Sequence, residues 1–311
     1  ARMILNESLT LRGSVSTGFK APTVGQSNVV NVTTAFSPEG LEDQATLPPT
    51  NPISIQLGAT PLSPEESINI SFGMVGEIAK QFYFTLDYFH IELHDRISTT
   101  SALDLSQDDI NTLVLAGITE ASSYGSAKFF TNDFDTTTQG IDAVVNYDTY
   151  LFNIPSRFMF TYNWTDTKVD RVTLYSRIRT DGSTYLESNL TPQRIQMIED
   201  NLPGHRGSVS VVQAYNNLSS NIRLNYYAGF YEDHLDAAAG LDIYTGSELT
   251  LDLDISYQLN ANFKLSVGAK NLLDNRPDSN PYSGNAGSLY AATSPLGING
   301  GLYYFRALYE F

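Results

Sequence analysis

The chain has 311 residues, a formal net charge of −16 and no cysteine. The lack of cysteine excludes disulfides and thiolate chemistry, and the acidic balance argues against a nucleic-acid partner, which Lys and Arg clusters would have to bind. No apolar run approaches the ~18 residues of a membrane helix, so entry into a membrane would require a barrel. The first residues lack the apolar core of a secretory signal, and we interpret the chain as a mature protein or a piece of a longer one.

Ten segments alternate apolar and polar side chains with the two-residue period of a β-strand. In chain order they cover residues 9–19, 67–74, 81–97, 137–147, 157–166, 206–215, 221–231, 249–259, 263–270 and 302–311. Most are about ten residues long, which is the length of a tilted strand that crosses a membrane.

The connections between these segments alternate strictly between short and long. Short connections follow every second segment, and the long ones cover residues 21–64, 98–134, 170–205, 233–247 and 274–299. All tight turns then lie at one end and all long loops at the other, as in outer-membrane barrels. This predicts an all-β, antiparallel up-and-down transmembrane β-barrel with about ten strands present. Residues 104–117 have helical apolar spacing and predict a short helix within a loop.

The hairpin formed by residues 249–259 and 263–270 allows a prediction of register. Apolar side chains must meet apolar side chains, which requires a loop with an odd number of residues. The predicted pairs are Leu259 with Phe263, Tyr257 with Leu265, Ile255 with Val267, Gln258 with Lys264 and Asp252 with Lys270.

Alternation also assigns side chains to the two faces of the barrel. We predict a lumen-facing set of charged residues, which would hydrate and brace the interior: Arg12, Asp142, Arg157, Arg223, Asp252, Asp254, Lys264, Lys270 and Arg306. We predict a lipid-facing aromatic girdle formed by Phe158, Phe160, Tyr162, Trp164, Tyr257, Tyr303, Phe305, Tyr309 and Phe311.

Two groups of side chains raise the question of a metal site. His90, Glu92 and His94 share one face of a strand, but neighbours on that face lie nearly 7 Å apart, so one ion could not reach both imidazoles without a bulge. His234 lies beside Glu232, Asp233 and Asp236 in a loop that lacks a calcium-loop spacing. We prefer a polar strand end and a solvated acidic loop, and expect no metal site. Nucleophile-elbow, phosphate-loop and zincin motifs do not occur, so neither an enzyme nor a cofactor is expected.

A series of motifs resembles a known family. They lie at residues 16–23, 62–65, 86–97, 138–142, 202–206, 268–275 and 309–311. In this order they are similar to the GFKAP, Pro-Glu, DYYxIxIxDRI, TxGID, LPxHR, GxxNLxD and aromatic C-terminal motifs of TonB-dependent outer-membrane receptors. The resemblance extends over residues 9–311.

The resemblance implies a barrel of 22 strands closed by an N-terminal plug domain, in the outer membrane of a Gram-negative bacterium. The chain would then be the C-terminal part of the barrel, without the plug and the early strands. The implied function is uptake of a scarce nutrient, such as a ferric siderophore, haem, corrinoid or glycan, with energy relayed by TonB. The implied partners are outer-membrane lipid, the plug with the early strands, TonB, and a small extracellular ligand.

Two other classes of protein remain open on the sequence alone. A self-contained small barrel, either a porin or a barrel enzyme, requires residues 9–19 and 302–311 to pair as neighbouring strands. A soluble carbohydrate-binding β-sandwich requires the face formed by Phe158, Phe160, Tyr162 and Trp164 to pack against a second sheet.

Overall fold

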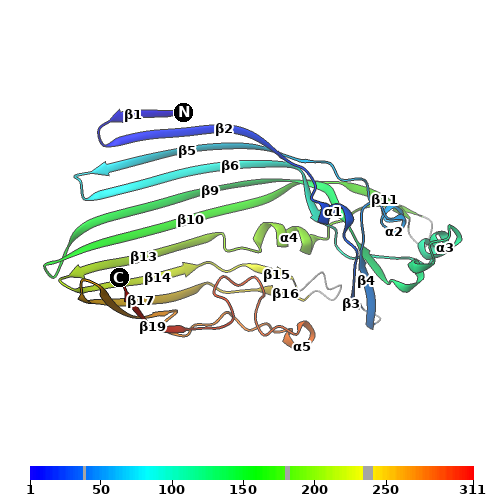
Figure 1. Cartoon of the computed structure of the whole chain (residues 1–311). Coiled ribbons are helices and arrows are strands. Elements are labelled where there is room, and N and C mark those ends of the chain that lie inside the picture. Colours follow the sequence, from blue (N-terminus) through cyan, green and yellow to red (C-terminus); the bar gives the residue numbers. More distant parts are fainter. Residues whose placement is uncertain (38–39, 179–182, 234–240) are drawn as a thin grey trace.

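The computed structural model describes residues 1–37, 40–178, 183–233 and 241–311. Within these residues eleven antiparallel strands form one curved sheet, with hairpin turns at its left end and long loops at its right end in Figure 1. Across the sheet the strands are β1 (Arg2–Asn6), β2 (Leu9–Lys20), β5 (Glu65–Ile78), β6 (Phe82–Thr99), β9 (Phe130–Leu151), β10 (Ile154–Val172), β13 (His205–Tyr215), β14 (Leu218–Tyr227), β17 (Glu248–Asn260), β18 (Phe263–Lys270) and β19 (Leu302–Tyr309).

All ten predicted segments are strands of this sheet, and β1 is an additional strand that the sequence did not predict. The predicted segment 221–231 was too long, because β14 ends at Tyr227 and Tyr231 is buried in the loop hairpin of β15 (Tyr231–Asp233) and β16 (Asp242–Tyr244). The predicted alternation of turns and loops is confirmed. Two of the turns, at Ala79–Lys80 and at Phe152–Asn153, have positive φ at both central residues, the conformation that matches strand twist in tight hairpins.

The register of the β17–β18 hairpin is confirmed in part. Tyr257 pairs with Leu265, Ile255 with Val267, and Gln258 with Lys264, as predicted. The pairing of Leu259 with Phe263 was wrong, because Phe263 pairs with Asn260 and the ladder is irregular between Gln258 and Asn260. Pairing apolar with apolar side chains requires one extra residue in this hairpin. That residue is a bulge near the end of β17 and is not part of the turn.

One face of the sheet is apolar across its whole width. Because directly opposed residues of paired strands lie on the same face, the register shows which side chains are neighbours. One such row is apolar on nine successive strands, namely Ile78, Phe82, Tyr147, Phe158, Val211, Ile222, Leu253, Ala269 and Tyr303. Many large apolar side chains of this face are exposed, including Phe72 at 52% and Phe305 at 67%.

The exposed apolar face and the strand order bear on both remaining alternatives. Phe160 is 42% exposed, whereas a β-sandwich would cover this face with a second sheet. A small closed barrel would pair β2 with β19, but β2 lies between β1 and β5, and β19 pairs with β18 among the described strands. The sheet is therefore an open segment of a barrel. No described helix is both long and apolar enough to cross a membrane.

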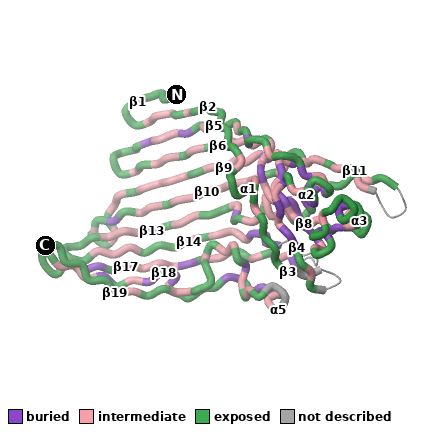
Figure 2. The backbone as a smooth tube through the Cα atoms, turned by 45° about the vertical axis from the view of Figure 1, so that its right-hand side comes forward, coloured by how far each residue is buried: buried purple, intermediate pink, exposed green. Residues whose placement is uncertain are grey.

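The long loops fold into structures of their own, which the sequence did not predict. Loop residues after β2 and after β6 together form a four-stranded sheet of β3 (Asn31–Ser37), β4 (Gly40–Thr46), β8 (Ser126–Lys128) and β7 (Leu103–Asp104), in which β4 and β8 are parallel. This sheet and the helices α2 (Pro52–Gln56) and α3 (Gln107–Leu115) make up what we call the loop domain. Buried residues gather there in Figure 2, and they include Ile53 and Phe129, which are 0% exposed.

Helix α3 confirms the predicted loop helix. Ser106 caps its N-terminus with a capping box, in which the Ser106 side chain and Asp109 each satisfy a backbone N–H of the other residue. A second loop helix, α4 (Pro192–Asp200), packs against β10 beyond the point where β13 begins. The hairpin β11 (Leu174–Ile178) and β12 (Thr184–Ser188) belongs to the same loop.

Candidate functional site

The polar face of the sheet carries a single file of charged and hydrogen-bonding side chains, which we call the charged row. Each member is directly opposite the next one on the neighbouring strand. In strand order the row consists of Arg2, Arg12, Gly73, Asp87, Asp142, Asn163, Arg206, Tyr227 and Glu248. The row therefore holds three Arg and three carboxylates.

The neighbouring rows on the same face contain no charge. On the turn side the row is Thr10, Val75, Thr85, Val144, Thr161, Ser208, Asn225 and Thr250. On the loop side it is Ser14, Ser71, Phe89, Gly140 and Thr165. These two uncharged rows thus flank the charged row and separate it from the other charges of the polar face.

The charged row climbs from the turn end of the sheet to the loop end. Arg12 lies near the turn end of β2, whereas Glu248 is the first residue of β17, at its loop end. Because directly opposed residues lie side by side across antiparallel strands, this change comes from the stagger of the strand ends along the sheet.

A gap at Gly73 lets Arg12 reach across one strand. The Arg12 guanidinium donates from Nε to Asp87 Oδ1 at 2.8 Å and from a second nitrogen to Asp87 Oδ2. A Cβ on Gly73 would lie 1.9 Å from Asp87 Oδ1, so only glycine leaves room for this bidentate pair. The pair holds the Asp87 carboxylate, which lies directly opposite Asp142.

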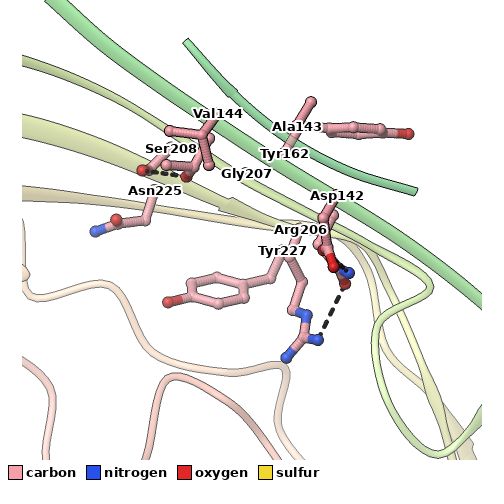
Figure 3. A pocket seen from close by; sticks show the side chains of 11 residues that line it. Asp142, Ala143, Val144, Tyr162, Arg206, Gly207, Ser208, Asn225 and Tyr227 are labelled. Atoms are coloured by element: carbon pink, nitrogen blue, oxygen red, sulfur yellow. Dashed lines mark hydrogen bonds between the residues drawn. The ribbon is translucent and has the colours of Figure 1, made fainter. Parts of the chain in front are cut away.

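The upper part of the row encloses a hollow of about 350 Å³, which we call the Arg206 hollow (Figure 3). Asn163 Nδ2 donates to Asp142 Oδ1 at 2.7 Å, and Arg206 donates to Asn163 Oδ1 at 3.0 Å. Figure 3 shows Arg206 and Tyr227 projecting to the same side of the sheet, whereas Tyr162 projects to the other side. The hollow belongs to the polar face.

Side chains on the floor of the hollow form hydrogen bonds with one another and with neighbouring strands. The hydroxyls of Thr161 and Ser208 lie 2.8 Å apart, and Asn225 Nδ2 donates to Thr250 and to Asp252. These side chains are held in place by neighbours in adjacent strands. The other polar side chains that line the hollow belong to the charged row.

At the loop end of the sheet, carboxylates accept hydrogen bonds that connect neighbouring segments. Buried Asp133 accepts hydrogen bonds from the Tyr175 hydroxyl at 2.6 Å and from Asn189 Nδ2 at 2.9 Å. Burial, and then the contact with Asp133, raises the pKa of Tyr175 above its usual value. Hydrogen bonds from Arg171 lower the pKa of Asp135 to about 2, so this carboxylate stays ionised.

The sequence model of the TonB dependent receptor-like β-barrel family matches residues 2–272. The chain belongs to this family. A sequence comparison with curated proteins gives no match.

Solved structures of similar fold cover the whole chain. The G324V mutant of the ferric enterobactin receptor PfeA of Pseudomonas aeruginosa has 14% identity and a TM-score of 0.63, over 99% of this chain and 38% of that one. The siderophore receptor PirA of Pseudomonas aeruginosa has 14% identity and a TM-score of 0.59, over 100% and 41%. The copper transporter OprC has 14% identity and a TM-score of 0.61, over 100% and 38%. These identities show the fold alone, and the chain spans about two-fifths of the length of these proteins.

The structure places all nine predicted lumen residues on the polar face of this family barrel. Arg12 and Asp142 belong to the charged row. The other seven lie in other rows, for example Arg157, which forms a bidentate pair with Asp148 near a turn, and Asp254, which accepts from the Tyr304 hydroxyl at 2.6 Å. The predicted pairing of Asp252 with Lys270 lies beyond the last pair of the ladder, Leu253 with Ala269.

Eight of the nine predicted girdle residues lie on the apolar face, and Phe311 follows β19 with its ring 5.1 Å from that of Tyr309. That this face contacts lipid stays a prediction.

The strand-end histidines contact neighbouring carboxylates one at a time. His90 Nε2 lies 3.1 Å from Glu92, whereas His94 lies 3.9 Å from Glu92 and 3.7 Å from Asp135. Among the described residues no group of three His, Asp or Glu is arranged to hold a metal ion. His234 and Asp236 lie outside the described residues. Glu232 instead accepts from the backbone N–H groups of Ala292 and Thr293, which joins two loops.

Of the nine members of the charged row, only Arg12 and Asp142 were predicted, and the other seven were missed. Asp87 was noted only as part of the family motif at residues 86–97. Arg206 was noted only as the first residue of the predicted segment 206–215. Their place on the polar face follows from alternation with neighbours such as Thr85 and Ser208. Their alignment in one row depends on register between strands that long loops connect, which the sequence does not show.

Proposed function

We propose that the chain is the C-terminal part of the barrel of an outer-membrane receptor that takes up a scarce nutrient with energy relayed by TonB. One observation carries this proposal: an eleven-stranded sheet with an apolar face across its whole width, a polar face, and all long loops at one end. Such a sheet suits a wall between lipid and an aqueous lumen. Membership of the TonB-dependent receptor family supports the same function.

The proposal assigns the polar face to the lumen and the loop end to the cell exterior. The nine lumen residues named above would line the passage, and the nine aromatic residues would face lipid and its interfaces. Early barrel strands would pair with the free edges of β1 and β19, and a plug domain would fill the lumen and contact TonB. The protein would be a transporter and not an enzyme, in the outer membrane of a Gram-negative bacterium.

The nutrient would be a ferric siderophore, haem, a corrinoid or a glycan. The similar structures include a ferric enterobactin receptor and a copper transporter, but identities of 14% do not transfer a ligand to this chain.

Cell fractionation and uptake assays test this function. The complete receptor should appear in the outer-membrane fraction and migrate as a compact species on gels unless boiled. Import of its nutrient should stop when the proton gradient is collapsed or TonB is deleted, whereas binding to whole cells should persist. Recovery in the soluble fraction, or import that survives both treatments, would refute the proposal.

A further inference from the structure

We propose that the Arg206 hollow binds a neutral, polyhydroxylated ligand such as a segment of a glycan. This inference rests on the proposed function, because it names the class of nutrient that the polar face receives. It goes further in assigning the contact to Arg206 and Tyr227.

The hydrogen bonds of the hollow leave donors directed at a ligand. A guanidinium has five N–H donors, and among the described residues Arg206 uses one of its nitrogens, on Asn163 Oδ1. Asn163 cannot rotate freely, since its amide also donates to Asp142. Arg206 is therefore positioned by this relay while its other donors stay available.

Tyr227 and Asp142 complement the guanidinium. Tyr227 lies directly opposite Arg206 on the neighbouring strand, so its ring and hydroxyl border the same space. A phenol hydroxyl both donates and accepts, and the ring offers an apolar surface. The second carboxylate oxygen of Asp142 adds an acceptor at the other end of the hollow. Sugar hydroxyls, which donate and accept at once, match this mixture.

The balance of charge argues against an ion as the ligand. The positive charge of Arg206 is offset by Asp142 on one side, and Glu248 follows Tyr227 in the row on the other. An anion would meet these carboxylates and a chain of net charge −16. A cation would meet Arg206. A neutral ligand can use both kinds of group without electrostatic cost.

The position of the hollow makes it accessible from the loop end. β13 begins at His205 and β14 ends at Tyr227, so the hollow lies where both strands pass into loops. Its volume of about 350 Å³ lies at the lower end of the range of small-molecule sites, which is about 300–1,000 Å³. A ligand entering between the loops would reach this part of the charged row first.

Isothermal titration of the complete receptor in detergent tests the inference. The probes are neutral trisaccharides of glucose, xylose, mannose and galactose, with citrate as the anionic probe. We expect at least one neutral sugar to bind, with Arg206→Met weakening its binding at least tenfold and Tyr227→Phe weakening it several-fold. The matched control is Lys168→Met, which removes a basic side chain at the loop end of β10 on the opposite face and should leave binding unchanged.

Three results would overturn the inference: no neutral sugar binds, citrate alone binds, or sugar binding is indifferent to Arg206→Met and Tyr227→Phe. With any of these results the proposed function still stands if the receptor imports another nutrient in a TonB-dependent manner. Conversely, sugar binding at Arg206 without energy-dependent import would refute the proposed function and keep the site.

Discussion

A substitution at Gly73 tests whether glycine is needed there for the ion pair between Arg12 and Asp87. We consider Gly73→Ala, which adds one methyl group to the polar face of β5. The new Cβ would lie 1.9 Å from Asp87 Oδ1 and 3.2 Å from Arg12 Nε. The Asp87 carboxylate must therefore turn away, and the bidentate contact with Arg12 is lost.

The expected magnitude follows from the exposure of the pair. The Arg12 side chain is 50% exposed and that of Asp87 is 26% exposed, so water screens their attraction. Exposed ion pairs contribute about 0.2–1 kcal/mol to the free energy of unfolding, and the bidentate geometry places this pair near ~1 kcal/mol. Alanine in a strand interior is itself favoured over glycine by roughly 0.5–1 kcal/mol. In the native background the two effects oppose each other, and the net change should be small.

A double-mutant cycle separates the two effects. Without the Asp87 carboxylate, Gly73→Ala no longer breaks a pair and should stabilise the barrel by about 0.5–1 kcal/mol. The coupling between Gly73→Ala and Asp87→Ala should therefore be about 1 kcal/mol. Urea unfolding of the complete receptor in detergent, followed by intrinsic fluorescence, gives the four free energies. If Gly73→Ala has the same effect in both backgrounds, glycine is not there to admit the ion pair.

Three further substitutions test other parts of the structure. Tyr304→Phe removes the hydroxyl that donates to Asp254 at 2.6 Å and should lower the free energy of unfolding by about 1 kcal/mol; an unchanged urea midpoint would mean that water replaces the contact. The pKa of Asp135 is lowered to about 2 by Arg171, so its contribution to stability is present above about pH 4 and lost as pH falls toward 2. Asp135→Asn should flatten unfolding free energy in that window, and an unaltered pH profile would contradict the assignment. Phe129→Ala empties the core of the loop domain and should cost that domain about 3–5 kcal/mol; proteolysis should then cleave residues 98–128 while the gel mobility of the folded barrel stays native, and uniform resistance would count against an independent core.

The sequence predicted the strands because each of them has one apolar face and one polar face. A strand with one face against lipid and the other against water must alternate, and β17 shows this with leucines opposed to Asp252 and Asp254. The same logic assigns faces without any knowledge of neighbours. The predicted segments 137–147 and 157–166 were shorter than β9 and β10, because the alternation of apolar and polar side chains fades toward the ends of these strands.

The loop domain was beyond prediction for a different reason. Its strands are short, and β8 has only three residues, which pair with β4 from a loop more than seventy positions earlier. Within it α3 was predicted from a local signal, namely the apolar spacing that follows its Ser106 cap. The core around Phe129 exists because two separate loops meet, and neither loop shows this in its own composition.

The charged row exists only because of the register between neighbouring strands. The demand that apolar meets apolar fixes each strand pair only to within two residues, because a shift of two keeps every side chain on its own face. Such a shift between β10 and β13 would place Asn163 opposite Ser208 in place of Arg206, and Phe160 would still face a valine, Val211 in place of Val209, on the apolar face. Amphipathicity alone therefore cannot produce a single file of charges. The contacts from Arg12 to Asp87 and from Arg206 through Asn163 to Asp142 favour one register among several that keep every side chain on its own face. The row that we infer to receive the ligand thus also helps to select the alignment of strands that creates it.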